Sequence, residues 1–452
     1  MLTAGATPNP AAPPPFPLRD AHLHLAEHGE SLSMLSLSAC TSVAEVLALV
    51  SRAAADQPDR HAWIRGVGLR TEALAEQRPP TARELSDASG GRRVMLRSFD
   101  HHALVVSSAI LALAGITAET PDPPGGVIRR DGREPTGTLL EHACDPVWRA
   151  LPAPTDAQYT AHVRAALQDL AAHGFTEVHD MFARERLIRT LHTLEAAGEL
   201  ATQVELYATP EHFDAVLALT RAHEHRGSLV RFGGLKLFAD GTLNSRTAFM
   251  LTPYTDPLPG SPCGTPLLSD SDLSAALTRA RAAGTRVAVH AIGDAAVRRV
   301  LDAIESESRD ASPSRRRAAT AQPHRIEHAQ FVDESDIPRF ASLGVIASPQ
   351  PCHLLTDIEA INRFTPHRAA RAFPLRDLVD AYSSASLDPA EWILLGSDAP
   401  VVPPNPHDNI QSATHRRRPD SPPSATIAPE QSIDEPTAWR FMRAQPRAHA
   451  TG

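Results

Sequence analysis

The 452-residue chain is almost without lysine: it contains one, Lys236, against 43 arginines. Arginine stays protonated in proteins, whereas a buried lysine can lose its proton and react as an amine. Since arginine fills every other basic position, we interpret position 236 as one whose chemistry requires lysine.

Cysteine is also scarce, with four residues that are far apart and form no CxxC motif. This spacing argues against a disulfide framework and against a structural zinc knuckle. We expect buried thiols at Cys40, Cys144, Cys263 and Cys352.

A basic excess and long apolar runs are missing as well. The chain has 44 Lys and Arg against 53 Asp and Glu, a net charge of -9, so it lacks the basic character of nucleic-acid-binding proteins. No apolar run approaches the roughly 20 residues of a membrane span, and residues 1–16 are Pro/Ala-rich rather than signal-like. We expect a cytoplasmic protein with a small-molecule substrate, no nucleic-acid or membrane partner, and a flexible tail over residues 1–16.

What the sequence does contain is a series of short apolar runs, several of them followed by a helical pattern. This alternation predicts parallel βα units. Strands are expected at residues 16–24, 175–180, 204–209, 232–239, 286–291, 324–330, 344–350 and 392–398. Helices are expected at residues 160–174, 187–200, 272–284 and 294–305. The predicted fold class is therefore α/β, a (β/α)8 TIM barrel over residues 17–452 with its active site at the carboxyl ends of the strands.

Residues 60–150 do not follow this alternation. They contain HAWIRGVGL, RRVMLRSFDHHALVV and the turn-like DPPGGVIRRDGREPTG. We interpret them as a β-rich insertion between the first two barrel strands.

Polar residues gather at the carboxyl ends of the expected strands. Alternation along the first strand places His22 and His24 on one face with Asp20. Four later strands carry Lys236, His290, His328 and Asp398 at or near their ends. Imidazoles and carboxylates are the ligands that zinc prefers, and a catalytic zinc site keeps one position open for water. The pattern therefore predicts a catalytic metal site at the barrel mouth.

Two of these assignments have alternatives. In HRIEH both His324 and His328 could face inward, and we favour His328 because it lies nearer the end of the strand. Asp398 follows an apolar strand, where an unpaired carboxylate is costly to bury, so it is either a ligand or the cap of a turn.

The chain resembles the amidohydrolase superfamily, and within it the amidohydrolase-3 group that includes enzymes similar to N-substituted formamide deformylase. The matching motifs run in order from residue 16 to about residue 440: DAHLH, DHHALVVSS, DPPGGVIRRDG, EPTGTLLE, HGFTEVHD, GGLKLFADGTLNSRTA, VAVHAIGDAAV, HRIEHAQ, SPQPCHLLTD and LLGSDAPV. The resemblance implies one or two divalent metal ions held by His22, His24, Lys236, His290, His328 and Asp398. It also implies that Lys236 is carboxylated by CO2 and bridges the metals, a reaction that arginine cannot undergo.

The chain departs from this family in one large way, and in a smaller one at Ser107 of DHHALVVSS, where the family usually has Asn. Relatives flank the barrel with a small β-sandwich built from both termini, and fewer than 20 residues precede Asp20 here. We expect the sandwich to be absent, and we expect a homo-oligomer, because a barrel surface without its usual cover is an association site.

The expected activity is hydrolysis of a C–N bond in an amide, N-formyl or cyclic amide substrate. A water activated by zinc attacks the carbonyl, and Asp398 acts as the general base that takes its proton and returns it to the leaving nitrogen. Five further residues are expected to bind the substrate or support the ligands: His102, His179, Asp240, Arg246 and His353.

Two other functions remain open. A mononuclear deaminase of an aminated ring would use His22, His24, His290 and Asp398 and leave Lys236 idle. A non-catalytic small-molecule binder on the same barrel would need none of these residues as metal ligands.

Overall fold

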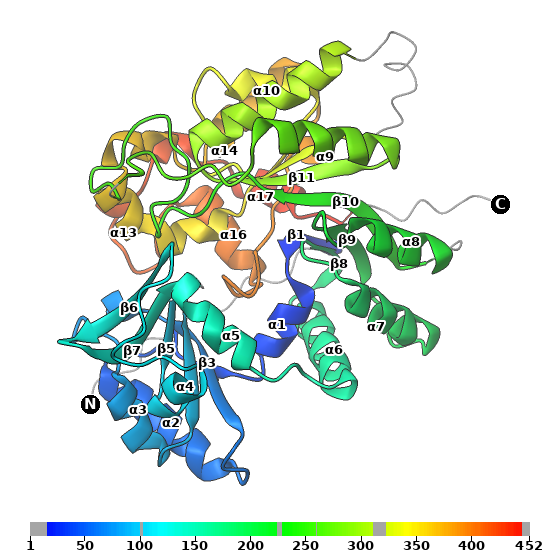
Figure 1. Ribbon diagram of the computed structural model, residues 1–452. Coiled ribbons are helices and arrows are strands. Elements are labelled where there is room, and N and C mark those ends of the chain that lie inside the picture. Colours follow the sequence, from blue (N-terminus) through cyan, green and yellow to red (C-terminus); the bar gives the residue numbers. More distant parts are fainter. Residues whose placement is uncertain (1–15, 100–102, 224–227, 259, 311–321, 445–452) are drawn as a thin grey trace, which may run out of the picture. The chain divides into compact units, whose positions relative to one another are not determined.

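The computed structural model describes residues 16–99, 103–223, 228–258, 260–310 and 322–444 (Figure 1). Two compact units make up the chain: Met1–Leu25 with Leu167–Gly452, and Ala26–Ala166. Residues 1–15 of the expected tail and His102 lie outside the described residues. Within the described ranges, no helix has both the length and the apolar character needed to cross a membrane.

The first unit is built around a parallel β-sheet. Hydrogen bonds join its seven strands in chain order: β1 (Leu18–Leu23), β8 (Phe175–Asp180), β9 (Gln203–Ala208), β10 (Val230–Phe238), β11 (Arg286–Ala291), β12 (Arg325–His328) and β13 (Ile346–Ser348). Each neighbouring pair is parallel. β1, β12 and β13 are buried along their whole length, so the charged and polar side chains of β1 (LRDAHL) and β12 (RIEH) are enclosed by the protein.

Residues 392–398, the expected eighth strand, close the sheet into a barrel. They make isolated parallel bridges rather than a regular ladder, Ile393 with Ala347 of β13 and Ala399 with Leu23 of β1. A Cβ at Gly396 would lie 2.5 Å from the backbone nitrogen of His22, so only glycine allows this close approach to β1. The predicted (β/α)8 TIM barrel is therefore confirmed.

Helices connect the barrel strands, and several of them lie on the outside of the sheet (Figure 1). They are α6 (Asp156–Ala172), α7 (Glu185–Ala196), α8 (Phe213–His223), α9 (Asp270–Ala282), α10 (Asp294–Asp310), α12 (Ile337–Leu343), α13 (Leu354–Phe364), α14 (Leu375–Ser384), α15 (Pro389–Trp392), α16 (Pro406–Thr414) and α17 (Glu435–Phe441). The four expected helices correspond to α6, α7, α9 and α10. In α9, Ser269 caps the helix by accepting a hydrogen bond from the Asp272 amide, and the buried face includes Leu273 and Leu277.

The second unit separates β1 from β8 in the chain and contains a six-stranded mixed sheet. The strands pair in the order β2 (Leu35–Ser36), β3 (Trp63–Leu69), β4 (Arg93–Ser98), β5 (Ala103–Val106), β7 (Glu134–Glu141) and β6 (Gly126–Asp131). Its helices are α1 (Leu25–Ser31), α2 (Val43–Asp56), α3 (Ala82–Ser89), α4 (Ser108–Leu113) and α5 (Asp145–Ala150).

This unit is longer than the expected insertion over residues 60–150. It begins at Ala26 because β2 pairs with β3 and because α2 buries Val46 and Val50 in the same core cluster as Val94 of β4. A helix that precedes the first long strand carries no β signal, so the sequence pattern places the beginning of the unit too late.

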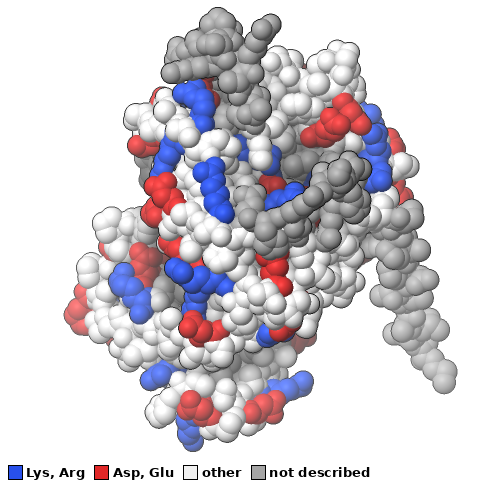
Figure 2. All heavy atoms as spheres, turned by 90° about the vertical axis from the view of Figure 1, so that its right-hand side faces the viewer, with Lys and Arg blue, Asp and Glu red and all other residues white. Residues whose placement is uncertain are grey.

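Charged side chains of both signs are interspersed on the face displayed in Figure 2, with no extended area of one sign among the described residues. This distribution agrees with the near balance of acidic and basic residues in the sequence.

Candidate metal centre

Three side chains from distant parts of the chain converge at the carboxyl ends of the barrel strands. One ligand atom from each of His22, His328 and Asp398 lies within 4.8 Å of the corresponding atoms of the other two. The Nε2 atom of His22 is 3.4 Å from the Oδ1 atom of Asp398, and the rings of His22 and His328 are 4.9 Å apart. All three residues are buried. The structure thus brings together three of the predicted metal ligands.

The backbone of β12 explains how its last residue reaches this cluster. His328 has a φ of 70°, which breaks the strand alternation and allows Glu327 and His328 both to contact the site. The His328 ring lies 4.4 Å from that of His290. His324 instead accepts a hydrogen bond from the Val287 amide and pairs with Glu307 of α10 at 3.3 Å. His328 rather than His324 therefore lies in the cluster.

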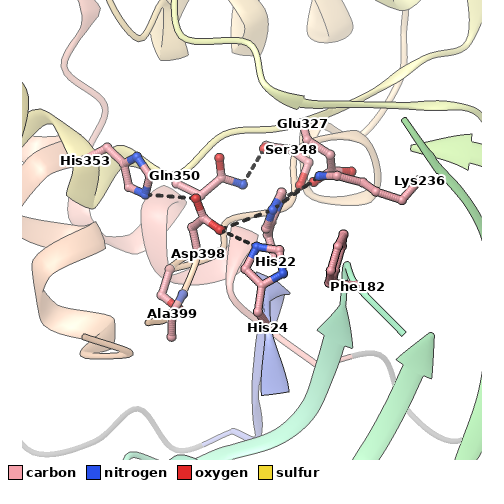
Figure 3. A network of polar contacts seen from close by, with 12 residues as sticks. His22, His24, Phe182, Lys236, Glu327, Ser348, Gln350, His353, Asp398 and Ala399 are labelled. Carbon is pink, nitrogen blue, oxygen red and sulfur yellow. Dashed lines mark hydrogen bonds and ion pairs between the residues drawn. The ribbon is translucent and has the colours of Figure 1, made fainter. Parts of the chain in front are cut away.

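Asp398 occupies the centre of the cluster, with His353 on one side and His22 and His24 on the other (Figure 3). Its Oδ1 atom is 3.0 Å from Nε2 of His24, and its Oδ2 atom is 3.7 Å from Nε2 of His353. Burial opposes ionisation of this carboxyl, but the adjacent imidazoles, above all that of His22, hold its pKa well below the usual range. Asp398 is therefore a carboxylate at neutral pH.

The imidazoles of His22, His290 and His328 are neutral at the same pH. Burial, with the positive charge of Lys236, lowers the pKa of His22 to about 4 and that of His290 to about 3. Burial, followed by the neighbouring His290, places the pKa of His328 well below its ordinary value. Neutral imidazoles offer the lone pairs that metal ions bind.

Lys236 lies in β10 and is completely buried. Its Nζ atom is 3.5 Å from Nε2 of His22 and 5.1 Å from the centre of the Phe238 ring. Burial lowers the pKa of its ammonium group to about 8. The position that the composition marks as exceptional is thus adjacent to the cluster.

Two further observations fit a divalent cation at this place. The buried Nε2 atom of His353 and the buried Oε1 atom of Gln350 have no hydrogen-bond partner among the described residues. Buried polar atoms are rarely left unpaired, so these atoms need a partner that the chain itself does not supply. The neutral imidazoles of His22 and His328 and the carboxylate of Asp398 form a donor set suited to zinc.

Sequence reasoning missed the carboxylate that orients His22. Oε2 of Glu327 is 2.7 Å from Nδ1 of His22, which leaves Nε2 of that ring directed at Asp398 and Lys236. Nε of Arg325 donates to Oε1 of Glu327 at 2.7 Å. Burial opposes ionisation of Glu327, but the charge of Arg325 and the hydrogen bond with His22 outweigh it and hold the pKa of this carboxyl well below its usual range. Arg325 and Glu327 are two residues apart on one strand face, a signal that could have shown both to be inward-facing.

His179 belongs to the same buried network, below the cluster of ligands. Its Nδ1 atom is 2.8 Å from Arg325, and its Nε2 atom is 3.0 Å from Glu177. The Tyr207 hydroxyl accepts from Arg325 at 3.1 Å and donates to Glu205 at 2.6 Å. His179 is therefore connected to His22 through Arg325 and Glu327.

Asp240 and Arg246 have contacts of a different kind. Asp240 accepts hydrogen bonds from the backbone amides of Phe249, Ile292 and Gly293, and its Oδ1 atom is 3.6 Å from Nε2 of His290. It thus anchors the loop after β10 beside a predicted ligand. Arg246 pairs with Asp256 at 3.1 Å within that loop.

Comparison with known proteins agrees with this geometry. Residues 17–448 match the model of an amidohydrolase family. The chain belongs to the amidohydrolase family. It is therefore an enzyme of the hydrolase class, as the sequence motifs predict.

Two relatives illustrate the similarity of this amidohydrolase to known sequences. YtcJ of Bacillus subtilis (strain 168) is 33% identical over 407 residues, which cover 88% of this chain and 72% of YtcJ. The N-substituted formamide deformylase of Arthrobacter pascens is 27% identical over 451 residues, which cover 96% of this chain and 78% of the deformylase.

Solved structures of similar sequence share the fold. Two uncharacterized metal-dependent hydrolases, from Pyrococcus horikoshii and Pyrococcus furiosus, superpose with TM-scores of 0.71 and 0.68. Each is 27% identical to this amidohydrolase and matches 94% of it, with 78% and 80% of their own chains covered.

Proposed function

We propose that this amidohydrolase hydrolyses a C–N bond in an amide, N-formyl or cyclic amide substrate with the help of one or two zinc ions. The observation that carries the proposal is the buried convergence of His22, His328 and Asp398, with one ligand atom of each within 4.8 Å of the others. The deformylase among its relatives supports the choice of an amide-type bond.

The proposed ligands are the six residues at the strand ends. His22, His24 and Asp398 come from β1 and the closing segment, and His290 and His328 from β11 and β12. Lys236, as a carbamate, would contribute a second carboxylate between them. When bound, divalent metal ions supply Lewis acidity toward a water molecule and toward the substrate carbonyl.

Asp398 is the proposed general base. The side chain is ionised at neutral pH, so it would accept a proton from the attacking water and then return that proton to the leaving nitrogen. Nε2 of His353 lies 3.7 Å from the other oxygen of Asp398, beyond hydrogen-bond distance, so it would be available to a polar group of the substrate. We propose it as a substrate-binding residue.

Metal analysis of the purified protein, combined with turnover of a panel of amides, N-formyl amines and cyclic amides, tests this function. We expect about two zinc ions per chain and hydrolysis of at least one member of the panel. About one metal ion per chain and release of ammonia from aminated rings would favour a mononuclear deaminase. Protein without bound metal after growth in zinc would favour a non-catalytic binder.

The bond between Glu327 and His22 leads to a prediction on metal affinity. Glu327→Gln keeps the size of the side chain but removes the charge that holds the Nδ1 proton of His22. Replacing a carboxylate that orients a metal-binding histidine typically costs 10- to 100-fold in metal affinity. We therefore expect zinc to bind about 10- to 100-fold more weakly, measured by competition with a chromophoric chelator.

Glu307→Gln is the matched control, because Glu307 also pairs with a histidine, His324, but on α10 outside the cluster. This variant should bind zinc as the wild type does. Equal zinc affinity of Glu327→Gln and Glu307→Gln would show that Glu327 does not position a ligand.

A further inference from the structure

A cleft of about 480 Å³ adjoins the candidate metal centre within the barrel unit. Its walls come from the segments that follow β8 and β9 and from the end of β10, and they include Phe182, Glu211, Phe238 and Leu267. Lys236 is also one of the residues that surround the cleft, so the cleft and the metal centre have a residue in common. A group held in the cleft is therefore within reach of the proposed reaction site.

The inner wall of the cleft is aromatic. The rings of Phe182 and Phe238 meet edge to face with centroids 6.5 Å apart, and each also lies beside a predicted metal ligand. Phe182 is 6.1 Å from the His24 ring, and Phe238 is 5.5 Å from the His290 ring. Flat or aliphatic groups pack well against such a wall.

The outer lip of the cleft exposes more apolar surface than its neighbours. Leu267 is 59% exposed and Phe238 is 37% exposed, the first being the most exposed large apolar side chain among the described residues. Apolar surface beside a concave site is a common mark of ligand binding, because a ligand that covers it removes that surface from water.

The side chain of Arg184 places a positive charge at this lip. The guanidinium of Arg184 lies 4.8 Å above the centre of the Phe182 ring, which restricts its orientation. Among the described residues, no carboxylate is within ion-pair distance of Arg184, although a guanidinium offers five donors. Its donors are thus available to an anionic ligand.

The other charged groups of the cleft are already engaged. Glu211 accepts hydrogen bonds from the Thr209 side chain and from its own backbone amide, which together lower the pKa of its carboxyl. His212 pairs with Glu185 at 3.0 Å. Glu211 is an anion near Arg184, so it weakens the attraction for a second anion without saturating Arg184.

We infer that this cleft binds an apolar, preferably aromatic, substituent of the amide substrate, and that Arg184 binds a carboxylate at the outer end of that substituent. The inference rests on the proposed amide hydrolysis for the place of the scissile bond. It adds a substrate class: amides that carry an apolar group terminated by a carboxylate.

Two matched ligands test this inference on the full-length, zinc-loaded protein. N-benzylformamide fills the apolar part alone, and 4-(formamidomethyl)benzoate adds the carboxylate. We expect calorimetry to show that the wild type binds the carboxylate ligand roughly fivefold more tightly, since an exposed ion pair with fixed geometry contributes modestly. Arg184→Gln should abolish this preference, whereas Arg189→Gln, on an exposed position of the same helix, should retain it.

Two more variants separate charge from apolar packing. Glu211→Gln removes a repelling charge and should increase the preference for the carboxylate ligand about twofold. Leu267→Ser should weaken both ligands by the same factor and leave their ratio unchanged. The inference would be overturned if Arg184→Gln left the preference for the carboxylate ligand unchanged, or if Glu211→Gln reduced that preference. A failure of either ligand to bind would also overturn it.

Turnover measured with the same two compounds separates this inference from the proposed function. Binding with the expected pattern but without hydrolysis, of these compounds and of the amide panel, would overturn amide hydrolysis and leave the carboxylate site standing. Hydrolysis of both compounds with no effect of Arg184→Gln on their relative affinity would support amide hydrolysis and overturn the carboxylate site.

Discussion

Asp398→Asn should lower the turnover of this amidohydrolase by roughly 10²- to 10⁴-fold, the usual contribution of a positioned general base. Asparagine preserves the shape of the side chain but cannot take a proton at neutral pH. Asp398 lies 3.0 Å from His24 and 3.4 Å from His22, so its carboxylate is at the centre of the predicted ligands.

The measurement is kcat on whichever amide of the panel is hydrolysed, with the metal content of each preparation determined in parallel. Asp336→Asn serves as the control, because Asp336 is also a buried carboxylate but pairs with Arg298 and Arg339 outside the cluster. It should keep kcat within about twofold of the wild type. A metal-replete Asp398→Asn enzyme with more than about a tenth of wild-type turnover would refute a general-base role.

The barrel strands could be predicted from the sequence because short segments with apolar residues alternate with helical patterns along the chain. β8 and β11 begin and end at the predicted residues. The closing segment was recognised by the same signal, although it forms isolated bridges, since its apolar residues are needed for packing even where Gly396 and the turn at Asp398 interrupt the ladder.

The orientation of the predicted metal ligands could be predicted from the sequence only in part. Strict alternation would send Glu327 and His328 to opposite faces, and the positive φ of His328 that brings both to the site leaves no mark in the sequence. The bond between His22 and Glu327 joins residues 305 positions apart, and no local pattern encodes such a pair. His353 was expected as a supporting residue, but its approach to Asp398 depends on the turn after β13.

The anchoring function of Asp240 could not be inferred from residue type either. A carboxylate after a strand suggests a ligand or a base, yet Asp240 accepts hydrogen bonds from three backbone amides. Burial raises the pKa of its carboxyl to about 7. Backbone partners are invisible in a sequence, because every residue except proline carries the same donor.

Lys236→Arg should remove the bridged metal ions and with them nearly all activity. In the wild type, burial lowers the pKa of Lys236 to about 8, so a substantial fraction of the side chain is a neutral amine close to neutral pH. The amine nitrogen can then add to the carbon of CO2 and release a proton, which converts a cationic side chain into a carboxylate. Arginine keeps its positive charge beside His22 and His290 and would repel divalent cations.

Three measurements examine this expectation. The zinc content should fall from about two ions per chain in the wild type to one or none in Lys236→Arg. Carbon-13 NMR after incubation with labelled bicarbonate should show a carbamate signal in the wild type that is missing from Lys236→Arg, and the assignment is simple because the chain has no other lysine. Lys236→Ala opens the position, so short carboxylic acids should partly restore its activity by occupying the place of the carbamate.

The comparison between the two variants distinguishes charge from fold. Both remove the lysine from a fully buried position, but only Lys236→Ala creates a space that an added carboxylate can fill. Rescue of Lys236→Ala without rescue of Lys236→Arg would therefore assign the loss to the missing bridging carboxylate rather than to an unfolded barrel. If Lys236→Arg kept its full metal content and wild-type turnover, the carbamate would have no function, and a mononuclear centre would account better for the chemistry of this barrel.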